Sequence, residues 1–307
     1  MPCCELEVPF NVTSAAGFLL LGLIFNWGLF GICIVQIYIY YLSFPNDKWR
    51  LKLLVYSLFI VETAQTLLVT HDMYNIFATE FGNIRNLGQI HIFWITTAIA
   101  TGLVSSAVQI YFAHRICIFS GSNLIGYTLS IIALIQGSAA IVEGVFFHIS
   151  TANFAEVQSD RKTHIIAIIW LAGSAICDVL IALSMTYYEK LSRAKENTVF
   201  RQTRARLNKV IRLTVETGAT TAVFATADMV LYLGFPGTEY CAVPALILAK
   251  LYTNTLLYTL NNRRCGAFGG QDELSSREGT WTLQFWNRML QTSQVGSRDP
   301  IEGIPTI

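Results

Sequence analysis

The segment between Glu7 and Asp47 contains no charged residue. A helix that crosses the hydrocarbon core of a bilayer needs about 20 mostly apolar residues, because each residue advances the helix by about 1.5 Å. The part from Ser14 to Leu42 is long enough and therefore predicts a membrane span. Only 13% of the 307 residues are charged and 53% are hydrophobic, whereas about 25% of residues are charged in a typical soluble domain. A soluble protein could not cover its surface with so few charges, so we expect lipid to surround much of the chain.

Six more segments are predicted to be spans, and the last three of them are interrupted by ionisable residues, so their bounds are the least clear. They are Leu51–Phe77, Ile90–Ala113, Leu124–Ile149, His164–Tyr188, Lys209–Phe235 and Ala242–Leu260. We therefore predict an all-α fold with a seven-transmembrane-helix bundle over residues 14–264. Residues 1–13 are expected to form an outer N-terminal segment. Residues 265–307 are expected to be a mostly disordered cytosolic tail, with an interfacial helix near 280–290.

Basic residues between the segments predict the orientation, because cytoplasmic loops carry an excess of Lys and Arg. The N-terminal segment and the second, fourth and sixth loops together contain only Arg85, Arg161 and Lys162. The basic residues of the opposite side are Lys48, Arg50, Arg115, Lys190, Arg193, Lys195, Arg201, Arg204, Arg206, Arg263 and Arg264. We therefore predict that the N-terminus faces outward and the C-terminus the cytosol. Asn11 begins a glycosylation sequon on the predicted outer side.

The connection between the fifth and sixth segments is strongly basic, with eight basic and two acidic residues over 189–212. Arg201, Arg204 and Arg206 lie in it. The favoured interpretation is that these residues set the topology and contact anionic lipid, and the alternative is a docking surface for a cytosolic signalling partner. The net charge of +1 gives no indication of a nucleic-acid partner. We expect a multi-pass protein of the plasma membrane, with an endomembrane as the alternative.

Ionisable residues inside a bilayer are costly, so they generally face a partner or a water-filled cavity. Asp228 lies eight residues before Pro236, about 12 Å below the outer end of its helix. Lys250 lies at a similar depth on the last helix, which follows directly in the chain, so we expect the two to pair. The structural alternative is an ion pair that fixes helix register without any ligand. The candidate ligand-binding residues are Lys250, Asp228, Glu143, Asn254 and Tyr252.

A second polar cluster is expected deeper in the membrane, where Glu62 and Asp178 lie near mid-span. If the protein is an enzyme, Glu62, Glu143 and Asp178 are the candidate catalytic acids, because acid catalysis in an apolar pocket needs a carboxyl group. Small residues recur every four positions in the third and sixth segments, which predicts that both helices pack centrally. No metal-binding motif is present, and we predict no metal and no cofactor.

The last segment carries the most specific part of a resemblance, since Lys250–Leu257 reads KLYTNTLL and Leu260–Arg263 reads LNNR. The first hairpin adds Leu29–Ile32, reading LFGI, and the third segment ends with His114-Arg115. Over about residues 14–264 the chain resembles the fungal, basidiomycete-type seven-helix membrane proteins that share a domain of unknown function, the 6534-type family. The resemblance implies a multi-pass fungal membrane protein of unassigned activity.

Three hypotheses for the function remain. The leading one is a receptor-like seven-helix protein that binds a small apolar ligand from the outer side; Arg115 resembles in position the arginine of G-protein-coupled receptors. The second is an intramembrane acid-catalysed enzyme of the terpene cyclase or isomerase type. The third is a transporter or a retinal protein. No internal repeat or broken helix supports a transporter, and the third segment has no acidic counter-ion for a retinal Schiff base at Lys250. A seven-helix architecture does not by itself decide among them.

Overall fold

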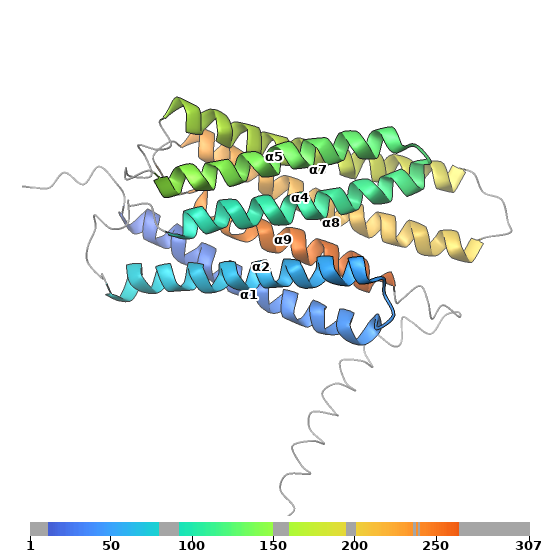
Figure 1. The fold of residues 1–307 in the computed structure, drawn as a ribbon, viewed down its shortest axis with the longest axis horizontal. Helices are drawn as coiled ribbons and strands as arrows, with labels where there is room; N and C mark the ends of the chain where they lie inside the picture. The colour runs from blue at the N-terminus through green and yellow to red at the C-terminus, as the bar shows by residue number, and fades with distance from the viewer. Residues whose placement is uncertain are drawn as a thin grey trace, which may run out of the picture. The chain divides into compact units, whose positions relative to one another are not determined.

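The computed structural model describes residues 12–79, 92–149, 160–194, 201–235, 238 and 240–263. These residues form seven α-helices, and the π-helical segment η1 (Asn75–Thr79) continues the second of them. The helices are α1 (Val12–Ser43), α2 (Trp49–Tyr74), α4 (Ile92–Ser120), α5 (Asn123–Ile149), α7 (Arg161–Ala194), α8 (Arg201–Gly234) and α9 (Ala242–Asn261). They lie side by side with similar axis directions (Figure 1). The all-α prediction is confirmed for the described part of the chain.

Each predicted segment corresponds to one helix, but α4, α7 and α8 extend beyond the apolar runs. The third segment was expected to end at Ala113, whereas α4 continues to Ser120. His114 and Arg115 interrupt the apolar run, but both are compatible with a helix, and the helix continues through the apolar residues Ile116–Phe119. The turn comes at Gly121, whose φ of 65° lies in the left-handed region that glycine adopts without a steric penalty. The prediction ended this helix where the apolar run is interrupted. In the structure the helix ends where the backbone turns.

Five of the helices are long and apolar enough to cross a membrane. They are Ala16–Ser43 in α1, α2 with η1, Trp94–Ser120 in α4, α5, and Arg161–Tyr188 in α7. Their outward faces carry large apolar side chains such as Val35, Ile60 and Leu183, which are each about 60% exposed (58%, 66% and 61%). Contiguous apolar surface of this kind is rare on soluble monomers. The chain is therefore a multi-pass integral membrane protein.

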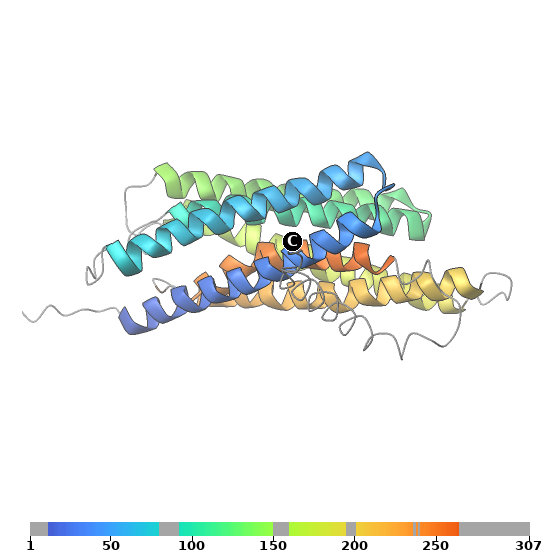
Figure 2. The ribbon, with the colours of Figure 1, turned by 90° about the horizontal axis from the view of Figure 1, so that it is seen from below.

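Helix α9 occupies the interior of the bundle, where it packs against α1, α2, α4 and α8 (Figures 1 and 2). Of its residues only Val243, Leu251, Tyr258 and Asn261 are not buried. Helix α4 packs against α2, α5, α7 and α9, which confirms its predicted central position. The central position predicted for the sixth segment is wrong, because α8 packs mainly against α7 and α9 and exposes 66% of Val223.

The closest helix crossing lies between α4 and α5. A Cβ atom added at Gly102 would lie 2.7 Å from the Cβ of Ala140, and one added at Gly137 would lie 1.8 Å from Oγ of Ser106. Ser106 also donates a hydrogen bond of 3.0 Å to the carbonyl of Ala133. Small residues let two backbones approach where lipid supplies no hydrophobic drive between helices. The small residues of the third segment therefore do mark a close crossing.

Asp47, in the turn between α1 and α2, connects that turn to the C-terminal end of α9. It accepts hydrogen bonds from Tyr40 (2.9 Å) and from Nη2 of Arg263 (2.6 Å). The guanidinium carbon of Arg263 also lies 4.5 Å from the ring centroid of Phe44. Asn11 and residues 265–307, with the sequon and the interfacial helix predicted there, lie outside the described residues.

Candidate functional site

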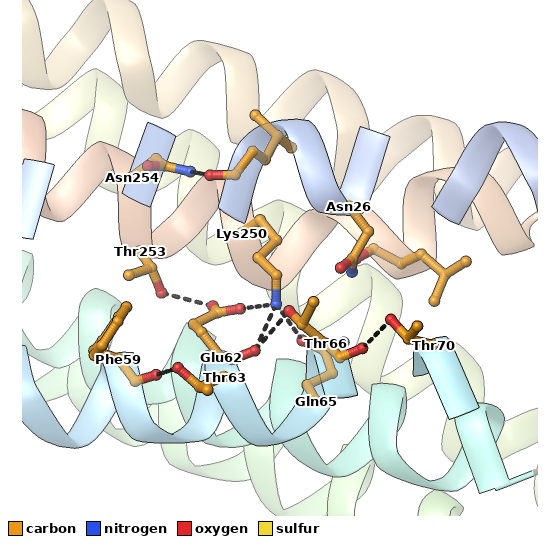
Figure 3. Close-up of polar contacts among 12 residues, drawn as sticks. Asn26, Phe59, Glu62, Thr63, Gln65, Thr66, Thr70, Lys250, Thr253 and Asn254 are labelled. Atoms are coloured by element: carbon orange, nitrogen blue, oxygen red, sulfur yellow. Dashed lines mark hydrogen bonds and ion pairs between the residues drawn. The ribbon is translucent and has the colours of Figure 1, made fainter. Parts of the chain in front are cut away.

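Lys250 and Glu62 form an ion pair in the interior of the bundle, between α9 and α2 (Figure 3). Both side chains are completely buried. The pair predicted between Lys250 and Asp228 is therefore wrong, because the ammonium group points toward α2 rather than α8. The rule that consecutive antiparallel helices are neighbours holds for α8 and α9. It does not determine which face of α9 carries the lysine.

The ammonium group of Lys250 has an acceptor for each of its three N–H donors. These acceptors are Oε2 of Glu62, the main-chain carbonyl of Glu62 at 3.1 Å and Oε1 of Gln65 at 3.1 Å (Figure 3). The other carboxylate oxygen of Glu62 accepts a hydrogen bond of 2.7 Å from Thr253. The ring centroid of Phe30 lies 5.6 Å from Nζ, within range for a cation–π interaction. The charge of Lys250 is thus compensated by α1, α2 and α9 together, and the pair connects these helices.

Three asparagines join α1 to α9 through main-chain carbonyls. Asn26 donates to the carbonyl of Leu246 (2.9 Å), Asn254 to that of Leu29 (3.0 Å) and Asn261 to that of Gln36 (2.9 Å). Asn254 was predicted to bind ligand, but its amide nitrogen is engaged in this helix contact (Figure 3). Its ligand-binding role stays a prediction.

Asp178 and Tyr252, two of the predicted site residues, meet in a second polar cluster between α7 and α9. The carboxylate of Asp178 accepts hydrogen bonds from the hydroxyl of Tyr252 (2.6 Å) and from Nε2 of Gln109 (2.9 Å). The Tyr252 hydroxyl also lies 2.8 Å from Oγ of Ser174. Gln136 extends the network from α5, because its Nε2 donates to Oε1 of Gln109 at 3.2 Å.

Sequence reasoning missed Gln109, Gln136 and Ser174 as members of this cluster. All three are buried. A glutamine within an otherwise uncharged span was the available signal, because an amide in lipid needs hydrogen-bond partners. The cluster joins α4, α5, α7 and α9 and has no basic member among these residues.

Glu143 and Asp228, the remaining predicted acids, line a small cavity between α4, α5, α7, α8 and the start of α9. Its volume is about 30 Å³, which is room for about one or two water molecules. The lining residues are Trp94, Thr97, Ala98, Glu143, Phe147, Trp170, Leu171, Asp228, Tyr232, Cys241 and Ala245. The carboxyl groups are 1% and 2% exposed.

Several polar atoms of this acid-lined cavity have no hydrogen-bond partner among the described residues. They are Oε2 of Glu143, Oγ1 of Thr97 and Nε1 of Trp170. Buried polar groups are nearly always hydrogen-bonded, to protein or to water. The described lining contains two carboxyl groups and no Lys, Arg or His. Unpartnered buried polar atoms occur at other places in the described structure too, but here they line a cavity that can take a ligand, water or ion.

The predicted site residues thus separate into three places, which are the ion pair at Lys250, the cluster at Asp178 and the acid-lined cavity. The backbone of Arg201, Arg204 and Arg206 belongs to the first turns of α8. Their side chains lie outside the described residues, so their contacts stay a prediction. Within the described residues no group of three His, Cys, Asp or Glu side chains is arranged to hold a metal ion.

Residues 174–265 match the model of a family of unknown function (DUF6534). The match runs from the middle of α7 through α8 and α9 and includes Asp178, Asp228 and Lys250. It supports membership of that family of unknown function, and the fungal origin stays a prediction. No curated protein and no solved structure matches the chain.

Proposed function

We propose that this protein is a receptor-like seven-span membrane protein that binds a small ligand in the acid-lined cavity. The observation that carries the proposal is the set of buried polar atoms without partners around a space that five helices enclose. A ligand that contacts all five helices can favour one arrangement of these helices over another. A receptor needs such a ligand, one that binds two conformations with different affinity. The volume of about 30 Å³ restricts the ligand to a very small molecule or to one inserted head group.

The proposal includes seven crossings, with the N-terminus outside. Helix α9 has 20 residues, which corresponds to about 30 Å, the thickness of the hydrocarbon core. Because α1, α2, α4 and α8 cover most of α9, α9 can cross the membrane without a broad apolar surface facing lipid. The turn at Asp47 and the end of α9 at Arg263 meet at one end of the bundle, and this end carries the basic connections, in agreement with a cytosolic position.

The orientation is tested with epitope tags at the two termini in intact cells. The proposal predicts antibody access to the N-terminal tag without permeabilisation and to the C-terminal tag only after it. Equal access to both tags, or the reverse pattern, would contradict an odd number of crossings in this orientation.

The basic connection between α7 and α8 is the proposed cytosolic face of the receptor. In this proposal Arg201, Arg204 and Arg206 contact anionic lipid and a cytosolic signalling partner. The support is the concentration of basic residues over 189–212 and the packing of both helices beside the acid-lined cavity, to which α7 contributes Trp170 and α8 contributes Asp228.

Ligand-dependent recruitment tests the receptor function. Cells that express the protein with a C-terminal luminescent tag are exposed to a panel of lipids, terpenes and amines, and recruitment of a G protein or arrestin is recorded. Ala245→Val fills the cavity, and Ala175→Val is its matched control, because both alanines are 7% exposed and only Ala245 lines the cavity. We expect at least one compound to act on the native protein and on Ala175→Val but not on Ala245→Val. A panel without effect, or an equal response of both variants, would overturn the proposal.

An intramembrane acid-catalysed enzyme is the second candidate. Glu62 is engaged by Lys250, and Asp178 accepts bonds from Tyr252 and Gln109, so Glu143 is the predicted acid that retains an unpartnered oxygen. Asp228 in the same cavity favours an acid pair. Pockets for drug-sized molecules measure about 300–1,000 Å³, so a polyprenyl substrate would need the helices to separate. Conversion of a polyprenyl substrate that is lost in Glu143→Gln would favour the enzyme over the receptor.

A further inference from the structure

We infer that the acid-lined cavity binds an ammonium group, either the ammonium ion or the head group of a primary amine. The inference rests on the proposed function, because it takes the same cavity as the ligand site and names the chemical class of the ligand. It replaces the apolar ligand expected from the sequence with a cation.

The charges of the described residues are the first argument. Glu143 and Asp228 both line the cavity, and its described lining has no basic residue. The buried lysine, Lys250, has all three donors engaged by Glu62 and Gln65. An ionised carboxylate away from water costs several kcal/mol unless it is paired and hydrogen-bonded. A cation in the cavity supplies the counter-charge that these side chains lack.

The hydrogen-bonding groups narrow the choice of cation. An ammonium group offers three or four N–H donors in a tetrahedral arrangement. The cavity offers acceptors in Oε2 of Glu143, in the carboxylate of Asp228 and in the hydroxyl oxygen of Thr97. An anionic ligand would add more acceptors to a described lining that has two carboxyl groups and no basic residue, and an apolar ligand would leave these acceptors buried and unpaired.

The aromatic part of the lining also favours an organic cation. Trp94, Phe147, Trp170 and Tyr232 line the same cavity as the acids, and the faces of aromatic rings attract cations within about 6 Å. Nε1 of Trp170 has no partner within the described structure. As a donor it can bond to one of the carboxylate oxygens or to a water bound beside the cation.

The volume of the cavity sets an upper limit on the head group. About 30 Å³ is room for about one or two water molecules, and an ammonium ion is about the size of one. A methylammonium ion, with two heavy atoms, is about the size of two water molecules, whereas a tetramethylammonium ion, with five heavy atoms, exceeds this space. The cavity should therefore discriminate among monovalent cations by size.

Thermal unfolding of the purified full-length protein in detergent tests the inference. Chlorides of ammonium, methylammonium, tetramethylammonium, sodium and potassium are compared at constant ionic strength. A ligand that binds only the folded protein raises Tm, and at ten times its Kd we expect a rise of about 3–6 °C for ammonium or methylammonium. Tetramethylammonium, sodium and potassium should give no saturable rise.

Three variants assign the effect to the acid-lined cavity. Glu143→Gln and Asp228→Asn should abolish the ammonium-dependent rise in Tm. Asp178→Asn is the matched control, because it neutralises another buried acid that does not line this cavity, and it should keep the rise. If either cavity acid proves necessary for folding, Thr97→Val removes an acceptor at nearly constant volume and should weaken ammonium binding about tenfold.

Each other outcome would overturn the inference. An equal rise in all salts, a larger rise with sodium, or a rise that persists in Glu143→Gln would assign the effect to salt, to a metal cation or to another site. No rise at all would indicate that protons or water satisfy the carboxyl groups. If ammonium gives no rise in Tm, but a panel compound still causes recruitment by the native protein and not by Ala245→Val, the receptor proposal holds without the ammonium inference. The two proposals can therefore fail separately.

Discussion

At Lys250 the cost of burying a charge is offset by complete hydrogen bonding. Moving a carboxylate and an ammonium group out of water costs several kcal/mol each, and their attraction repays this cost only when the geometry is excellent and the remaining donors are satisfied. Lys250 and Glu62 meet both conditions, since the three ammonium donors and both carboxylate oxygens have partners. The loss of one member would leave the other charged, buried and unpaired.

We therefore predict that Lys250→Met and Glu62→Gln each lower the free energy of unfolding by about 3–5 kcal/mol. The double variant should recover much of this loss, because no uncompensated charge remains. Denaturant unfolding of the purified protein in detergent measures the effect. The partly exposed pair of Arg263 and Asp47 is the control, and Arg263→Met should cost no more than about 1 kcal/mol. Single variants within 1 kcal/mol of the native protein, or a double variant at the sum of both losses, would contradict this account.

The depth of these residues could be predicted from the sequence, but their direction could not. A rise of about 1.5 Å per residue gives each charge its height in the membrane, and Glu62 and Lys250 were both placed well inside. The rotation of a helix about its axis decides which neighbour a side chain meets. This rotation depends on packing against all neighbours at once, and α9 has four of them. The pairing of Lys250 with Asp228 was wrong for this reason.

The close packing of α4 against α5 depends on glycine at the positions where the two helices cross. Gly102 and Gly137 lie where the two backbones cross, and a methyl group at either position would enter the space of the other helix. Gly31 on α1 is different, because an added Cβ would meet no atom within 4 Å. The same substitution should therefore have opposite effects at the crossing and on α1.

We predict that Gly137→Ala destabilises the protein by about 1–3 kcal/mol, the usual range for overpacking. Gly31→Ala should be neutral or stabilising by up to about 1 kcal/mol, because alanine favours the helical state over glycine. Both effects are measured as changes in the midpoint of denaturant unfolding. A neutral Gly137→Ala would mean that α4 and α5 can separate without cost, against the close crossing described here.

Small-residue spacing alone did not identify the central helix. The pattern occurs in α4 and α8. Among the described side chains, α4 uses it at a close crossing, whereas Gly218 of α8 has no atom within 4 Å of an added Cβ. The better signal for α9 is that polar residues are spread around most of its circumference, at Lys250, Tyr252, Thr253, Asn254 and Thr259. A helix in contact with lipid on one side would keep that side apolar.

For the whole molecule, the division of the sequence into mostly apolar segments predicted a membrane environment and the seven helices of the described residues, although five of these are apolar enough to cross a membrane by that criterion alone. Apolar runs of about 20 residues leave few alternatives in lipid, since each backbone polar group must be satisfied within the segment. The acid-lined cavity could not be predicted, because it depends on how five helices meet. Its carboxyl groups, Glu143 and Asp228, were nevertheless among the predicted site residues, because an ionisable group at that depth is costly and generally faces a partner or a cavity.

The central claim is that lipid surrounds a bundle whose last helix lies inside. Photolabelling of the native protein in bilayers, with a diazirine reagent dissolved in the lipid and peptide mapping by mass spectrometry, tests it directly. We predict dense labelling along the outward faces of α1 and α2, and on α9 labelling confined to Val243, Leu251 and Tyr258, which the other helices leave uncovered. Labelling of α9 along its whole length, at the density found on α1, would contradict the account.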